Sequence, residues 1–178
     1  MNSLMTLNYI FIQLIGFVGT GCYLVSFQFK KNRTLFMVQT AGYIFYTLHY
    51  YLLGALTGAA SYMVNLLRSI LLSSGKKWAC SWWACIGLCL LQLCAMKLTW
   101  AGWISILPCA ANIASTIGGY TYNARKIRAA NLFVNSPLCI IYAVIVGSWA
   151  GIIDEAISMA SIIVSIVRFG WKNLGEEK

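Results

Sequence analysis

Apolar stretches of helical length follow one another along the chain, with short polar connections between them. The pattern predicts seven helices, over 6–28, 33–53, 55–74, 79–96, 101–121, 128–147 and 149–171. A helix needs about 20 apolar residues to cross a hydrocarbon core of about 30 Å, and these stretches are close to that length. The chain is therefore predicted to be an all-α membrane protein with seven transmembrane helices.

The polar connections also repeat. The sequences GALTG at 54–58 and GSWAG at 147–151 each predict the turn of a tight helical hairpin. Each hairpin follows a basic cluster, which comprises Lys30, Lys31 and Arg33 in the first half and Arg125, Lys126 and Arg128 in the second. We expect a three-helix repeat in 1–75, a connector helix in 76–97 and a second repeat with a short tail in 98–178. The connector makes the two repeats parallel, and such repeats build many transporters around a central site.

The connector segment leaves a second arrangement open. Its tryptophans Trp78, Trp82 and Trp83 suit a membrane interface, so a six-helix chain with this segment lying at the interface is the alternative. The apolar run after them is long enough to span, which favours seven helices.

Composition and charge agree with a membrane protein. The chain is 60% hydrophobic and 10% charged, and its net charge of +9 comes from basic clusters in alternate connections rather than from one continuous surface. This distribution indicates a lipid bilayer as partner and argues against nucleic acid. Of the basic residues, only Lys97 falls on the opposite set of connections. The positive-inside rule then predicts an outside N-terminus and a cytoplasmic C-terminus.

The sequence offers little for catalysis or metal binding. The seven cysteines form no CxxC pair, and one histidine gives no zinc pattern. Cysteine as a small packing residue is the favoured interpretation. Without a nucleophile–base set or a phosphate loop, we expect no enzyme activity, no metal and no cofactor.

A few polar residues stand inside the apolar helices. Asp154 and Glu155 lie in the seventh helix, where a carboxylate is costly unless it faces a partner or a cavity. At least one is expected to face the interior; the alternative is that both are solvated near the outer interface. Asn65 and Arg68 share one face of the third helix. Arg68 either lines a cavity or extends to the inner headgroups.

Other polar residues complete the prediction. His49 lies near the outer end of the second helix and forms either a gate with a carboxylate or part of an aromatic belt. Two prolines, Pro108 and Pro137, are predicted to interrupt the fifth and sixth helices and serve as hinges. The predicted gate or proton-coupling groups are His49, Asp154 and Glu155. The predicted solute-binding residues are Asn65, Arg68, Glu155, Ser158, Asn112, Asn135 and Tyr46.

Two stretches of the chain carry a family resemblance. LHYYLLGALTGAASYMVNLLRSIL and GSWAGIIDEAISMASIIVSIVRFG resemble the bacterial inner-membrane proteins of the YgjV type. This resemblance implies a multi-pass protein of the bacterial cytoplasmic membrane. The three-plus-one-plus-three layout is also similar to the SWEET sugar transporters and the PnuC vitamin transporters, which bind a small polar solute between two three-helix bundles. The SWEET prolines of the first half are absent here.

The leading functional hypothesis is a uniporter or proton-coupled carrier of a small sugar-like or vitamin-like solute, working by alternating access between the two bundles. The alternative is a non-transporting sensor, receptor-like scaffold or accessory subunit. Seven helices suffice for a monomer, and exposed small-residue faces allow a homodimer.

Overall fold

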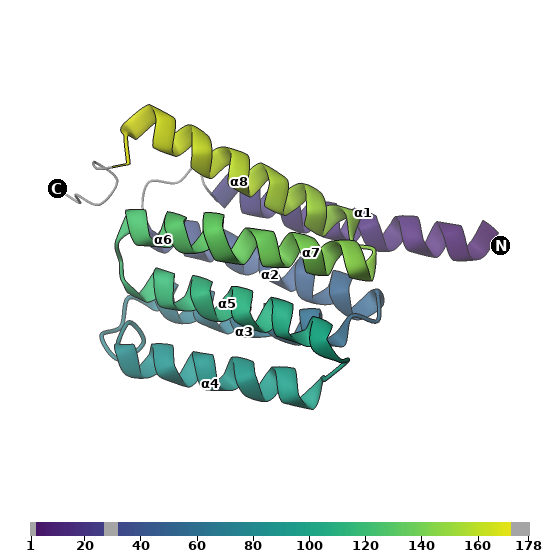
Figure 1. The fold of residues 1–178 in the computed structure, drawn as a ribbon, viewed down its shortest axis with the longest axis horizontal. Helices are drawn as coiled ribbons and strands as arrows, with labels where there is room; N and C mark the ends of the chain where they lie inside the picture. The colour runs from purple at the N-terminus through teal and green to yellow at the C-terminus, as the bar shows by residue number, and fades with distance from the viewer. Residues whose placement is uncertain (1–2, 27–31, 172–178) are drawn as a thin grey trace.

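The computed structural model describes residues 3–26 and 32–171, and this part of the chain is all-α. In chain order the elements are α1 (Ser3–Ser26), α2 (Asn32–Leu52), α3 (Leu56–Ser74), α4 (Trp82–Leu98), the 3₁₀ turn η1 (Trp103–Ser105), α5 (Ile106–Tyr120), α6 (Ala124–Ala130), the π-helical segment η2 (Asn131–Asn135), α7 (Ser136–Val146) and α8 (Trp149–Phe169). Since α6, η2 and α7 continue one another, the described residues form seven helical rods (Figure 1).

Three rods are long and apolar enough to cross a membrane by length and composition: Leu7–Ser26, Ala124–Val146 and Trp149–Arg168. A shorter apolar helix covers Trp82–Leu98. Each predicted helix therefore has a counterpart in the described residues, with ends that differ by a few residues. The prediction was wrong in detail for two rods: α5 begins only at Ile106, after a 3₁₀ turn, and the sixth rod begins at Ala124 and contains a π-helical segment.

The rods pack in two layers (Figure 1). One layer contains α8, α6–η2–α7, α5 and α4, and the other contains α1, α2 and α3 behind it. Within the layers α2 packs between α1 and α3, and α7 packs between α5 and α8. Between the layers α1 packs on α8 and α3 packs on both α4 and α5. The centre of the molecule thus lies between α2, α3, α5, α7 and α8.

The two glycine-flanked turns have the same backbone geometry. Gly54 and Gly147 both have φ of +74°, a left-handed conformation that glycine adopts without steric cost. In each turn the amide of the following residue donates to a carbonyl of the preceding helix: Ala55 to Tyr50 at 2.9 Å, and Ser148 to Ala143 at 2.8 Å. The likeness between GALTG and GSWAG is therefore one of backbone structure as well as sequence.

These two turns lie at one end of the bundle, and the connections α3–α4 and α5–α6 lie at the other (Figure 1). The second end carries the basic residues of both connections, among them Lys76, Lys77, Arg125 and Lys126. Lys30 and Lys31 of the predicted first basic cluster lie outside the described residues. The charge asymmetry predicted for the connections thus corresponds, within the described part, to one physical end.

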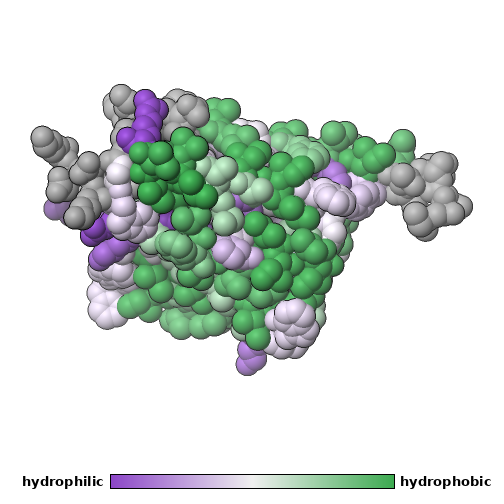
Figure 2. Space-filling view, turned by 45° about the horizontal axis from the view of Figure 1, so that its top comes forward, coloured by the Kyte–Doolittle hydropathy of each residue, from purple (hydrophilic) through white to green (hydrophobic). Residues whose placement is uncertain are grey.

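Apolar side chains dominate the visible surface (Figure 2). All seven tryptophans are exposed, by between 37% and 82%. Trp78, Trp82 and Trp83 precede α4 or begin it, whereas Trp100 and Trp103 follow it at the opposite end. With a rise of 1.5 Å per residue, α4 separates these groups by about 25 Å, close to the thickness of a hydrocarbon core. Tryptophan at both ends is typical of membrane–water interfaces.

Candidate functional site

A small polar cavity lies at the centre of the bundle. Its volume is about 20 Å³, which is near the space that a single water molecule requires. The lining comes from both layers and from five rods besides α1: the residues are Tyr23, Tyr43, Tyr62, Asn65, Arg68, Asn112, Ser115, Asn135, Cys139, Asp154 and Glu155. Most of these side chains carry a polar or charged group, so the apolar rods surround a polar interior.

Arg68 of α3 is held inside the bundle by hydroxyl groups. One terminal nitrogen donates to Ser115 Oγ at 3.0 Å and to Thr116 Oγ1 at 3.3 Å, and the other donates to Tyr43 OH at 3.1 Å. The side chain is only 6% exposed, so the alternative in which it reaches the headgroups does not hold. Arg68 therefore joins α3 to α5 and α2 through three hydrogen bonds to neutral groups.

Two asparagines meet across the interface between α3 and α5. Asn65 Nδ2 donates to Asn112 Oδ1 at 2.5 Å. The other amide atom, Asn65 Oδ1, is buried without a hydrogen-bond partner. Because an unpaired buried acceptor costs about 1–3 kcal/mol, it is a place where a bound donor would be stabilised.

Both acids of α8 are buried beside this cavity. Asp154 is 4% exposed and Glu155 is 7% exposed, so the alternative of two solvated carboxylates does not hold. Asp154 Oδ1 has no hydrogen-bond partner. Glu155 lies near Ser136 and Cys139. A carboxylate without a cation at membrane depth is unfavourable, so this pair is the strongest polar feature of the site.

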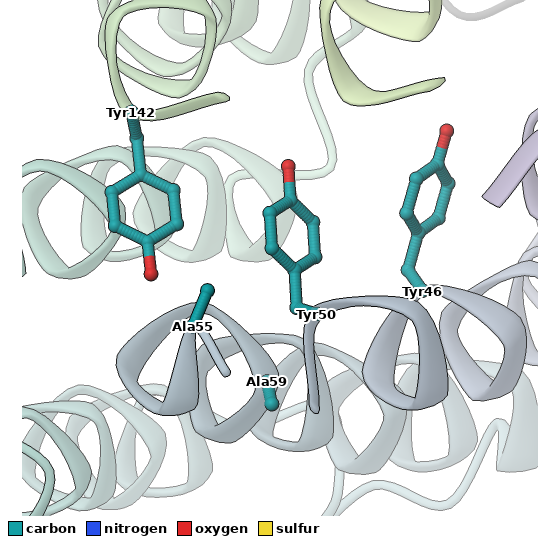
Figure 3. Packing of buried hydrophobic residues seen from close by; sticks show 5 residues of the cluster. All are labelled: Tyr46, Tyr50, Ala55, Ala59 and Tyr142. Atoms are coloured by element: carbon teal, nitrogen blue, oxygen red, sulfur yellow. The ribbon is translucent and has the colours of Figure 1, made fainter. Parts of the chain in front are cut away.

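A group of stacked tyrosine rings begins at the cavity-lining Tyr62 and continues along α2 toward its glycine turn. Tyr62 lies between Tyr46 and Tyr50, with ring centroids 5.0 and 5.1 Å away. Figure 3 shows Tyr46 and Tyr50 side by side on α2, with Tyr142 of α7 beyond them. All of these rings except Tyr62 belong to one buried cluster that also includes Ala55 and Ala59. The large buried area and the stacking of these rings stabilise the packing below the glycine turns.

His49 packs edge-on against Tyr46 and Tyr50 and is fully buried. Its Nδ1 donates to the carbonyl of Ile12 at 2.8 Å, and its Nε2 is 2.7 Å from Ser148 Oγ. Ser148 is also the N-cap of α8, where its Oγ accepts from the amide of Gly151. The predicted pairing of His49 with a carboxylate is therefore wrong, because both ring nitrogens are occupied by other partners. His49 instead ties α2 to α1 and to the start of α8.

A second hydrogen bond joins the two layers at the start of α3; this bond and the one between His49 and Ser148 are called the latches below. Tyr142 OH of α7 accepts from the amide of Gly58 at 2.9 Å. Tyr142 stands as far before GSWAG as His49 stands before GALTG, and Gly58 and Gly151 end the two motifs. Tyr142 thus caps the first turn of α3 directly, by accepting from the Gly58 amide. His49 supports the first turn of α8 indirectly, through Ser148, which accepts from the Gly151 amide.

One comparison with known proteins identifies a family for this chain. The family model described as Imp-YgjV, bacterial inner membrane protein, matches residues 10–173. The chain belongs to this family. It is accordingly a protein of the bacterial inner membrane, as predicted. Neither the curated proteins nor the solved structures compared with it include a significant match.

In this inner membrane protein, the predicted solute-binding residues separate into two groups. The structure brings five of them together around the cavity, with Asp154 beside them: Asn65, Arg68, Glu155, Asn112 and Asn135. Two others, Ser158 and Tyr46, are buried but do not line it. His49 lies at the glycine-turn end, away from the cavity lining.

The two prolines occupy different helical positions. Pro108 lies in the first turn of α5, where no helical N–H is required, so it does not interrupt that helix as predicted. Pro137 is the second residue of α7, which begins directly after η2. Since proline lacks an N–H, the widened turn before it has a local cause. Pro137 stays the stronger hinge prediction for this inner membrane protein.

Sequence reasoning missed several residues of the site. Tyr23, Tyr62 and Cys139 line the cavity, and Tyr142 and Ser148 form the latches. A signal for two of them was present around the similar sequences GALTG and GSWAG. Tyr62 stands at the position after GALTG that Glu155 holds after GSWAG, and Tyr142 matches His49. Aligning the halves residue by residue would have found both.

Proposed function

We propose that this inner membrane protein is a carrier of a small polar solute, with sugar-like and vitamin-like compounds as the first candidates. It works as a uniporter or with proton coupling, by alternating access between two parallel three-helix bundles, 1–75 and 98–178. The segment 76–97 serves as a connecting transmembrane helix. The single observation that carries this proposal is the buried polar cavity whose lining comes from both halves.

The packing of the helices supports the two-bundle arrangement. In each half the middle rod packs against both of its neighbours: α2 against α1 and α3, and α7 against α5 and α8. Exchanging the halves turns the α1–α8 contact into the α5–α3 contact, and both contacts occur. The corresponding hydrogen bonds of the two glycine turns, at 2.9 and 2.8 Å, follow the same exchange. Parallel repeats related by an axis along the membrane normal produce such a pattern.

Charge supports an orientation with the N-terminus outside and the C-terminus in the cytoplasm. The connections after α3 and α5 carry basic residues and lie at the end where α8 finishes. Connections rich in lysine and arginine stay in the cytoplasm. The glycine turns with their two latches then face the outside.

In this form the carrier would be closed at the outer side. The His49–Ser148 and Tyr142–Gly58 hydrogen bonds join the halves there, and the tyrosine stack lies beneath them. A cavity of about 20 Å³ has no room for a sugar-sized solute, so the bundles must separate to admit one. His49, the predicted gate residue, would act by releasing Ser148 rather than by pairing with an acid.

A non-transporting sensor or scaffold is the second candidate, and the small cavity volume favours it. In that case the buried polar groups would specify how the helices pack. Against it stand the unpartnered acceptors of Asn65 and Asp154, since a purely structural network is expected to satisfy its members.

The experiment is uptake into proteoliposomes that contain the purified protein. A panel of radiolabelled sugars, nucleosides and vitamins is tested with and without a pH gradient. We expect saturable uptake of at least one solute, which Glu155→Gln and Arg68→Ala abolish or reduce by more than tenfold. Lys126→Ala is the matched control, because it removes an exposed positive charge away from the cavity.

Folding must be checked for each variant by size-exclusion chromatography and helical circular dichroism. Absence of uptake for every solute by well-folded protein, together with normal behaviour of both cavity variants in cells, would refute the carrier. If Glu155→Gln and Arg68→Ala leave uptake unchanged, the solute does not bind in this cavity.

A further inference from the structure

In the central cavity, the buried atoms that lack hydrogen-bond partners are acceptors. The terminal nitrogens of Arg68 already donate to Tyr43, Ser115 and Thr116. The unpartnered atoms of the lining are oxygens: Asn65 Oδ1 and Asp154 Oδ1. The cavity therefore lacks a donor or a cation, and it offers acceptors to whatever enters.

Charge points in the same direction. The ionisable acid and guanidinium groups of the lining are Asp154, Glu155 and Arg68, so the fully ionised lining has an excess of one negative charge. Such an excess is costly at membrane depth. A single positive charge in the cavity would balance it, whereas a divalent cation would reverse the sign and a neutral solute would leave it unchanged.

Size and ligand type narrow the occupant further. About 20 Å³ accepts one water-sized species and excludes an organic cation with several carbon atoms. Carboxylate and amide oxygens are the ligands that hard metal cations prefer. Tyr43 and Tyr62 also line the cavity, and aromatic side chains attract cations.

We propose that the cavity between Asn65, Asp154 and Glu155 is a binding site for one dehydrated alkali-metal cation, Na⁺ or a close relative. Asp154 Oδ1 and Asn65 Oδ1 are the principal ligands, and the hydroxyl partners of Arg68 keep its guanidinium from occupying the place of the cation. This inference rests on the proposed function and names the alkali-metal cation, in place of a proton, as the coupling ion of the carrier. Binding itself can be measured without any transport.

The test is thermal unfolding of purified protein in detergent, at one pH and one ionic strength, in LiCl, NaCl, KCl or N-methylglucamine chloride. Unfolding is followed with a dye that fluoresces on reaction with thiols, since Cys85 and Cys109 are buried in the folded protein. We expect one alkali cation to raise the melting temperature saturably, by about 5 °C or more at 100 times its Kd. Direct binding of ²²Na⁺ to the same protein gives a second readout.

Asp154→Asn keeps the side-chain volume and removes the charge, so it should abolish the cation-dependent shift. Glu177→Gln removes one carboxylate from the C-terminal tail and should keep the full shift. Equal melting of the wild-type protein in all four salts, without ²²Na⁺ binding, would overturn the proposal even if Asp154→Asn does not fold. A full shift in Asp154→Asn would overturn it as well.

The outcomes separate this inference from the carrier hypothesis. If the protein binds no alkali cation and takes up solute equally well without one, the cation site is refuted and the carrier hypothesis stands. Selective cation binding by a protein that moves no solute retains the site and removes the carrier.

Discussion

The two halves pack closely at Gly58, and Gly58→Ala tests this contact. A methyl group there would stand 2.8 Å from Tyr142 Cε1, 2.9 Å from its hydroxyl and 3.1 Å from Tyr50 Cδ1. Contacts under 3.0 Å require movement, but Tyr142 and Tyr50 are only 4% and 2% exposed. The ring of Tyr142 must therefore shift within a filled interior, and its hydrogen bond with the Gly58 amide is disrupted.

The magnitude follows from three contributions. Overpacking costs about 1–3 kcal/mol, and leaving the Gly58 amide without its partner costs about 1–3 kcal/mol. The higher helix propensity of alanine returns about 1 kcal/mol. The net loss of stability is about 1–5 kcal/mol, which for a chain of this size lowers the melting temperature by at least about 2 °C.

The matched control is Gly87→Ala in α4. No heavy atom lies within 4 Å of a methyl group added there, so only the helix-propensity gain of up to about 1 kcal/mol applies. Both variants are melted in the same detergent with the thiol-reactive dye. We expect opposite signs: a lower melting temperature for Gly58→Ala, and an equal or higher one for Gly87→Ala. A Gly58→Ala protein that melts at or above Gly87→Ala would refute the close packing described for this interface.

Three further predictions concern the latches and the arginine. Tyr142→Phe keeps the ring but removes the partner of the Gly58 amide, so unfolding should cost about 1–3 kcal/mol less, whereas Tyr51→Phe, 61% exposed, should melt like the wild type. Ser148→Ala removes the α8 cap and a partner of His49, and we expect a loss of about 1–3 kcal/mol in the same melting assay. Arg68→Met keeps the length of the side chain but leaves Ser115, Thr116 and Tyr43 without their donor; its melting temperature should fall by several degrees, and an unchanged value would contradict the contacts described.

Some residues of the site could be chosen from sequence because their chemistry was out of place. Asp154, Glu155 and Arg68 are charged residues inside apolar helices, and such residues face an interior or carry a function. Helical periodicity added Asn65, which shares a face with Arg68. The facing partner of each group depended on packing between distant rods, so Asn112 and Ser115 were not assigned to Asn65 and Arg68 in advance.

His49 illustrates the opposite case. Its position near the glycine turn that ends α2 was readable from the sequence, and a carboxylate was a chemically reasonable partner. The structure gives it Ile12 and Ser148 instead, because α1 and the start of α8 pack against that face of α2. A side chain's partner is set by which elements are neighbours in space, and a single helix carries no information about that.

The sequence by itself determined the class of the protein, the approximate bounds of its helices and the two glycine turns. These features depend on hydropathy over about 20 residues and on the conformational freedom of glycine, both of which are local. The tertiary structure alone decided that the repeated turns cap each other through His49 and Tyr142. It also decided that Asp154 and Asn65 share one cavity with free acceptor oxygens. Those relations depend on how the two halves pack, and packing is a property of the whole chain.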